Sequence, residues 1–176
     1  MVRRLSRSSE HQSLDDIVAY RLDMVDGVVL LYRNASYYRR FGLMTIKELQ
    51  DQKKARLIEL DYQSVFSLLS AIEAVLKLDY DERISKRLKD NLSRHFRDLH
   101  KSKGHRVSLE DNILGAWQKY YQEMATFIQP LIKAFKFRHW LAHGRYWEPK
   151  FQRYDFDDIY ILADAVLKQF PLKIKV

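Results

Sequence analysis

The sequence of 176 residues contains no cysteine and has only five glycines and three prolines. Without cysteine the chain forms neither disulfides nor thiolate metal sites. Such a small number of glycines and prolines is too few to separate many strands, whereas Leu, Lys, Arg, Glu and Gln, which favour helices, are plentiful. The composition therefore predicts a helical protein, and the length fits one domain whose core needs no crosslinks.

Long apolar runs are also missing. No stretch approaches the roughly 18 apolar residues that a membrane-spanning helix needs, so no membrane partner is expected. The first residues are rich in Arg and Ser and lack an apolar segment, which excludes a secretory signal. They faintly resemble an organellar transit peptide, but a disordered basic arm over residues 1–12 is the favoured interpretation. We expect a cytoplasmic protein with one domain over residues 13–176.

Side chains that cap a first helical turn mark where helices begin. Ser13, followed by acidic residues, predicts one start, and Thr45 with Glu48 three positions later predicts a second. Apolar residues continue each pattern at helical spacing, and after residue 57 they are dense enough to predict a central helix packed on several sides. Further helices are expected over residues 84–101, 108–127 and 155–170. Pro130 either kinks a helix or restarts one, which then contains the segment up to residue 143. The sequence thus predicts an all-α, single-domain bundle of five or six helices.

Positive charge is concentrated in one segment of a chain whose net charge is +8. Residues 83–106 contain nine Lys or Arg and only two acidic residues. A solvated helix face explains most lysine runs, but this density favours a surface that binds a polyanion. The candidate RNA-binding residues of this segment are Lys86, Lys89, Arg94, Arg97, Lys101, Lys103 and Arg106.

One short segment contains the residue types that metal-independent phosphodiester cleavage needs. Within residues 137–146, four residues separate Arg138 from His143, and His139 directly follows the arginine. A guanidinium can hold two non-bridging phosphate oxygens at once. An imidazole, whose unperturbed pKa is about 6.5, can take up or release a proton at neutral pH.

This Arg-x4-His pattern, with small Ala142 before the histidine and Gly144 after it, resembles the motif of the HEPN superfamily. That superfamily comprises small α-helical domains, many of which are metal-independent ribonucleases. The helical composition, the chain length and the place of the motif on the penultimate helix also fit. The resemblance implies a toxin-type or defence-type endoribonuclease without a cofactor, which forms a homodimer with the motifs of two copies facing each other.

The resemblance also implies a reaction. The 2′-hydroxyl of RNA attacks the adjacent phosphorus and leaves a 2′,3′-cyclic phosphate and a 5′-hydroxyl. His143 would be the general acid or base, and Arg138 would hold the phosphate and offset its growing charge. His139 would orient the arginine or the phosphate. DNA lacks the attacking hydroxyl and would not be cut.

The spacing of the motif leaves two arrangements open. Arg138 and His143 lie about 140° apart on a regular helix. They converge either because the helix loosens before Gly144 or because the site forms across a dimer interface. His139 and His143 also have a spacing that can chelate zinc, but Arg138 beside them would repel a cation, so no metal site is predicted.

Residues around the motif raise further alternatives. In toxins of the superfamily that are encoded beside a nucleotidyltransferase antitoxin, a single residue separates the motif histidine from a tyrosine. Here Arg145 has that position and Tyr146 comes one residue later, which puts that subgroup in doubt. Arg145, Tyr146 and Trp147 could contact RNA by charge and stacking, or Tyr146 and Trp147 could pack the loop against the core. Glu73 is an acidic residue among apolar ones. Three roles are open for it: a salt bridge, a solvent-exposed position, or support for the cations of the motif.

Two other functions remain open beside cleavage. The same fold could bind RNA or a nucleotide through its basic segment without cutting it. It could also be an interaction protein that pairs with a cognate antitoxin.

Overall fold

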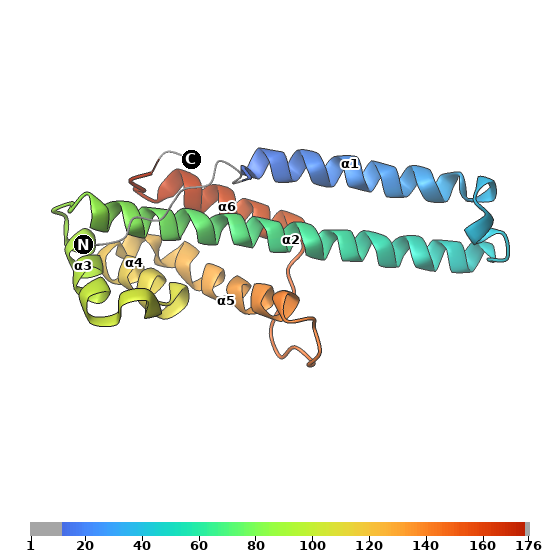
Figure 1. The fold of residues 1–176 in the computed structure, drawn as a ribbon. Coiled ribbons are helices and arrows are strands. Elements are labelled where there is room, and N and C mark those ends of the chain that lie inside the picture. Colours follow the sequence, from blue (N-terminus) through green and yellow to red (C-terminus); the bar gives the residue numbers. More distant parts are fainter. Residues whose placement is uncertain (1–11, 175–176) are drawn as a thin grey trace.

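The computed structural model describes residues 12–174 and contains helices but no strand in that range (Figure 1). The six α-helices of these residues are α1 (Leu14–Arg33), α2 (Ile46–Ser85), α3 (Asn91–Lys103), α4 (Gly115–Tyr120), α5 (Ala125–Ala142) and α6 (Phe156–Gln169). A π-helical turn, Leu109–Leu114, precedes α4. The predicted all-α bundle is confirmed, whereas residues 1–11 of the predicted basic arm lie outside the described residues. None of the described helices is long and apolar enough to cross a membrane.

Helix α2 is the axis of the molecule, with a length of 40 residues. Its second half contacts α3, α5 and α6, whereas its first half pairs with α1 in a hairpin that extends beyond the other helices (Figure 1). The apolar residues predicted for a central helix are largely buried, and those with the least exposure are Val65, Leu68, Leu69, Ile72 and Leu76. A helix buried on several sides therefore organises the core, as the sequence predicts.

Both predicted helix starts are present, and each of them has a capping box. The Ser13 hydroxyl accepts a hydrogen bond from the Asp16 amide at 3.1 Å, and the Thr45 hydroxyl accepts one from the Glu48 amide at 3.3 Å. In return, each carboxylate accepts from the backbone amide of its capping residue, at 3.0 and 2.7 Å. These bonds satisfy amides that the first turn of a helix leaves without partners, so both starts lie where the sequence places them.

Three predicted helix boundaries are wrong. The helix expected over residues 108–127 begins with a π-helical turn and ends at Tyr120. The basic helix does not begin at residue 84, because α2 continues to Ser85 and Asp90 then caps α3 by accepting from the Ser93 amide at 3.0 Å. Of the two alternatives at Pro130, the restart is wrong, because the helix before the motif begins at Ala125 and the proline lies inside α5. Proline costs a helix one amide hydrogen bond, and here packing of both flanks of α5 outweighs that loss.

Arg83 is fully buried and connects three segments. Its guanidinium donates to the Asp79 carboxylate at 2.6 Å, to Asp90 at 3.2 Å and to the carbonyl of Pro171 at 2.7 Å. It also lies 4.9 Å from the ring centroid of Trp117. Arg83 therefore joins the end of α2 to the start of α3 and to the chain after α6, and it is not part of an exposed basic surface.

We predict that Arg83→Ala lowers the free energy of unfolding by about 3–5 kcal/mol, because it leaves the buried Asp79 carboxylate without its counter-charge. Urea denaturation followed by circular dichroism measures this change. Lys101→Ala is the control, since its ion pair with Asp98 is exposed on both sides and contributes less than about 1 kcal/mol. Similar losses in the two variants would contradict a structural role for the buried network.

Candidate active site at the end of α5

The chain turns sharply where α5 ends, and this turn fixes the direction of the motif. His143 is the C-cap of α5. The amide of Gly144 donates to the carbonyl of Leu141 at 3.4 Å, and the amide of Arg145 donates to the carbonyl of Trp140 at 3.1 Å. This pair of bonds is a Schellman motif, which needs a left-handed residue after the cap, and Gly144 has a φ of +77°. The predicted helix end before Gly144 is confirmed.

Aromatic residues fix α5 on the body of the protein. Phe137 and Trp140 are buried and stack with ring centroids 5.8 Å apart, and Tyr62 of α2 meets both rings edge to face. The indole N–H of Trp140 donates to the carbonyl of Trp147 at 2.8 Å, which holds the loop after α5. The apolar residues of the motif segment therefore form core contacts, and its polar residues occupy the rest of the helix surface.

Arg138 is half-buried between α5 and α2. One guanidinium nitrogen lies 3.0 Å from the Glu73 carboxylate, and the guanidinium carbon lies 5.3 Å from the ring centroid of Phe66. Its Nε is buried and has no hydrogen-bond partner among the described residues. Glu73 also pairs with Lys77. Of the roles considered for Glu73, the salt bridge is the one observed, with Arg138 and Lys77 as its partners.

His139 and His143 lie side by side on the exposed surface at the end of α5. Their ring centroids are 4.2 Å apart, and the rings are tilted by 50°. His139 also lines a cavity with Arg138. No hydrogen bond, ion pair or ring contact joins Arg138 to His143 within the described chain. His139 therefore lies between the two motif residues, which do not meet in a single copy.

The cavity beside Arg138 and His139 has a volume of about 270 Å³ and is rich in carboxylates. Glu73 comes from α2, and Glu110 and Asp111 come from the π-helical turn. Burial, with the nearby charge of Asp111, raises the pKa of Glu110. A phosphate entering this cavity would meet three carboxylates, and Glu73 already engages one nitrogen of the Arg138 guanidinium.

Arg145 and Tyr146 have different surroundings. The Arg145 guanidinium donates to both oxygens of Glu59 on α2, at 2.7 and 3.0 Å, and these hydrogen bonds raise its pKa. Tyr146 is 83% exposed and touches only the edge of Trp147 among the described aromatic residues. Arg145 therefore fastens the loop to α2, whereas Tyr146 is accessible to a ligand.

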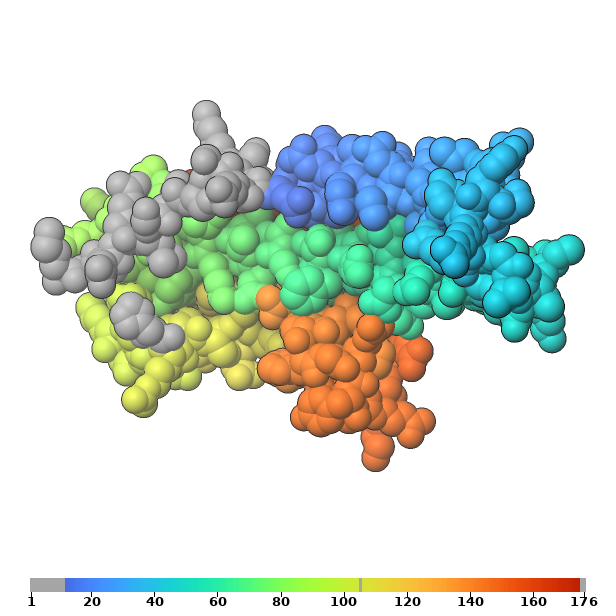
Figure 2. Space-filling view, turned by 45° about the vertical axis from the view of Figure 1, so that its right-hand side comes forward, coloured from blue at the N-terminus to red at the C-terminus, as the bar shows by residue number. Residues whose placement is uncertain are grey.

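The basic segment over residues 83–106 does not lie beside the motif. Figure 1 shows α3 at the end of the bundle where α5 begins, whereas the motif lies at the other end of α5. Figure 2 shows the end of α5 and the following loop as a separate protrusion. Several basic side chains of the segment already have partners: Lys86 pairs with Glu82, Arg97 donates to the carbonyl of Leu88, and Lys103 donates to Asn112.

The remaining RNA-binding candidates of this segment are exposed. These remaining candidates are Lys89, Arg94, Lys101 and Arg106. Their part in RNA binding stays a prediction, as does that of Lys86, Arg97 and Lys103.

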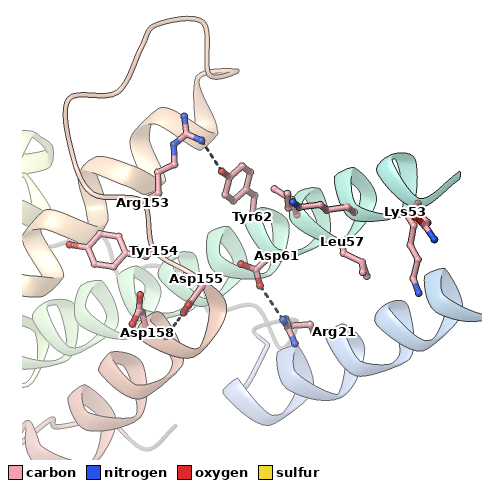
Figure 3. A pocket seen from close by; sticks show the side chains of 12 residues that line it. Arg21, Lys53, Leu57, Asp61, Tyr62, Arg153, Tyr154, Asp155 and Asp158 are labelled. Atoms are coloured by element: carbon pink, nitrogen blue, oxygen red, sulfur yellow. Dashed lines mark hydrogen bonds and ion pairs between the residues drawn. The ribbon is translucent and has the colours of Figure 1, made fainter. Parts of the chain in front are cut away.

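A cavity of about 740 Å³ lies between α1, α2 and the segment before α6, and no sequence pattern predicts it (Figure 3). Its basic residues include Arg21, Lys53, Lys54 and Arg153. These positions are scattered along the chain, and only the neighbouring lysines 53 and 54 could have drawn attention to it.

No protein-family model, curated protein or solved structure matches this chain. The resemblance to the HEPN superfamily therefore rests on the motif segment and the helical composition. Within the described residues, no group of three or more His, Asp or Glu is arranged to hold a metal ion.

We predict that Gly144→Ala lowers the free energy of unfolding by about 1–2 kcal/mol, because alanine strains a left-handed backbone. The matched control is Gly27→Ala in the middle of α1, where an added Cβ meets no atom within 4 Å. This control should raise the free energy of unfolding by about 0.5–1 kcal/mol. Urea denaturation compares the two, and changes of the same sign would contradict the assigned role of the turn.

Proposed function

We propose that this protein is a homodimeric, metal-independent endoribonuclease of the HEPN type. The observation that supports the proposal is the cluster at the end of α5. There, His139 is in ring contact with His143 and shares a cavity with Arg138. Two accessible imidazoles and one guanidinium provide the proton transfer and the phosphate binding that cleavage by the 2′-hydroxyl requires.

In the proposed reaction, His143 accepts the proton of the 2′-hydroxyl or donates one to the leaving 5′-oxygen. His139, whose imidazole lies beside that of His143, orients the phosphate or exchanges a proton with the phosphate. Arg138 holds the non-bridging oxygens as negative charge increases on them. Tyr146 is exposed beside these residues and offers a ring on which a base can stack.

A second copy is proposed to complete the site. In one copy Arg138 pairs with Glu73 and does not contact His143. Pairing of two copies through residues 138–146 would bring the histidine of one copy towards the arginine of the other. The phosphate must then compete with Glu73 for the guanidinium, and a cationic group from the second copy would make that exchange easier.

We predict a homodimer in solution whose interface buries more than roughly 1,000 Å² in total. Light scattering at tens of micromolar should give twice the mass of the 21.2 kDa chain. Ala142→Asp should shift the protein towards the monomer, because Ala142 is exposed within the proposed interface and the variant places a charge there. Leu43→Asp is the control, since Leu43 is fully exposed at the tip of the α1–α2 hairpin. A wild-type protein that remains monomeric would contradict the dimer and the composite site.

We predict that Arg138→Ala and His143→Ala each reduce RNA cleavage by about 10²–10⁴-fold, while the melting temperature changes little because neither side chain fills the core. Cleavage should persist in EDTA, give 2′,3′-cyclic phosphate ends and fail on RNA with a 2′-deoxy group at the scissile nucleotide. His95→Ala is the control, because His95 lies on α3 against Tyr120. Cleavage that continues in both motif variants, or that stops with chelator, would refute this mechanism.

One observation favours a second function, an RNA-binding or nucleotide-binding module that does not cut. Glu73 engages Arg138, and Glu110 and Asp111 line the same cavity, which opposes the approach of a phosphate. A folded dimer that binds RNA but leaves it intact would support this function instead.

A further inference from the structure

A cleft lies at the base of the α1–α2 hairpin, and Glu73 is not among the residues that line it. Its volume is about 740 Å³, which is within the range of ligand-binding pockets. Figure 3 shows Arg21 reaching in from α1, Lys53, Asp61 and Tyr62 from α2, and Arg153 from the loop before α6. Three elements that are distant in the sequence therefore form one basic cleft.

Three cations of the cleft have no carboxylate partner among the described residues: Lys53, Lys54 and Arg153. Arg153 instead donates to the Tyr62 hydroxyl at 3.2 Å, and its guanidinium lies 5.3 Å from the ring centroid of Trp140. Neither contact neutralises its charge. These side chains therefore remain available to an anion.

The carboxylates that line the cleft are largely engaged. Asp61 lies 3.1 Å from the Arg21 guanidinium. Asp155 caps α6 by accepting from the amide of Asp158 at 2.9 Å. In Figure 3, Asp155 and Asp158 lie at the start of α6, on the side of the cleft away from Lys53. The region between the lysines and Arg153 is therefore positive.

The separation of the cations indicates an extended ligand. Lys53 and Tyr62 are nine positions apart on α2, which is about 13 Å along the helix axis. Arg153 is hydrogen-bonded to Tyr62, so its charge is close to that end of the span. One phosphate cannot contact both ends, whereas a strand with several phosphates can.

The cleft also borders the candidate active site. Tyr62 lines this cleft and a second cavity formed with Leu141, Ala142 and Arg145 at the end of α5. A strand that occupies the cleft would continue past Tyr62 towards the motif. The basic residues of α3 lie at the opposite end of α5 and offer no such continuity.

We propose that this cleft binds the backbone of single-stranded RNA, with Lys53 and Lys54 contacting phosphates at one end and Arg153 at the other. It extends the function proposed above and rests on it for the choice of RNA as the ligand. Binding in the cleft does not itself require cleavage at the motif.

The test compares two triple variants of the full chain, each made with His143→Ala so that the RNA stays intact. The cleft variant is Lys53→Glu/Lys54→Glu/Arg153→Glu. The control, Lys86→Glu/Lys89→Glu/Arg94→Glu, makes the same change of net charge in the α3 segment. The probe is a fluorescein-labelled single-stranded oligouridylate, and anisotropy gives its affinity over a range of salt concentrations.

The cleft variant should bind at least about tenfold more weakly at about 0.1 M salt, and its log–log salt slope should fall by about two, as expected for three lost phosphate contacts. The α3 variant changes residues that are also candidate RNA contacts, and it should lose less affinity than the cleft variant because α3 lies at the other end of α5 from the motif. The Lys53→Glu/Lys54→Glu double variant should also bind more weakly. This double variant keeps Arg153 and its contacts with Tyr62 and Trp140. A loss of RNA affinity in it would therefore not arise from a disturbed loop before α6.

Equal weakening in the two triple variants, or a loss confined to the α3 control, would overturn the assignment of the cleft. If uridine monophosphate competes as well as the oligouridylate at the same nucleotide concentration, the cleft is a site for free nucleotides. That result would overturn the proposal that it binds an RNA strand. If wild-type protein binds through the cleft but cuts no RNA, the cleft proposal stands and the ribonuclease proposal fails. If the cleft variant without His143→Ala binds and cuts like wild type, the cleft proposal fails and the ribonuclease proposal stands.

Discussion

Three polar contacts fix the end of α5 and the loop after it on one helix, α2. Glu73 pairs with Arg138, Glu59 pairs with Arg145, and Tyr62 accepts a hydrogen bond from Arg153. These three residues of α2 lie over about four turns of a helix whose second half is largely buried. Buried packing holds α2 in place. The contacts to α2 therefore position residues 138–146, although much of that segment is exposed.

The same contacts set an electrostatic constraint on the candidate site. A phosphate that approaches Arg138 either shares the guanidinium with the half-buried Glu73 carboxylate or takes its place in exchange. The exchange is favourable only if other positive groups offset the cost of freeing Glu73, since an unpaired carboxylate in a partly buried position is unfavourable. The adjacent imidazoles of His139 and His143 are in position to contribute such charge when they are protonated, and a second copy would add more.

Charge density along the sequence and charge density in space differ in this protein. The segment over residues 83–106 has the most basic residues, yet Arg83 is buried and several others are bound to neighbouring groups. The cleft at the base of the hairpin contains fewer cations, but Lys53, Lys54 and Arg153 have no carboxylate partners within the described chain. A polyanion responds to unpaired charge at the surface, which makes the cleft the better-placed surface for RNA near α5.

The sequence by itself determined the helical class, the caps at Ser13 and Thr45 and the turn at Gly144, because local hydrogen bonds and backbone preferences decide these features. It also located the segment that contains Arg138, His139 and His143. Tertiary structure alone decided that α2 continues to Ser85, that Arg83 is buried, and that Glu73 holds Arg138. It alone also gathered the cleft from α1, α2 and the loop before α6. These outcomes depend on contacts between residues up to a hundred positions apart, and helical periodicity contains no information about which faces of separate helices meet.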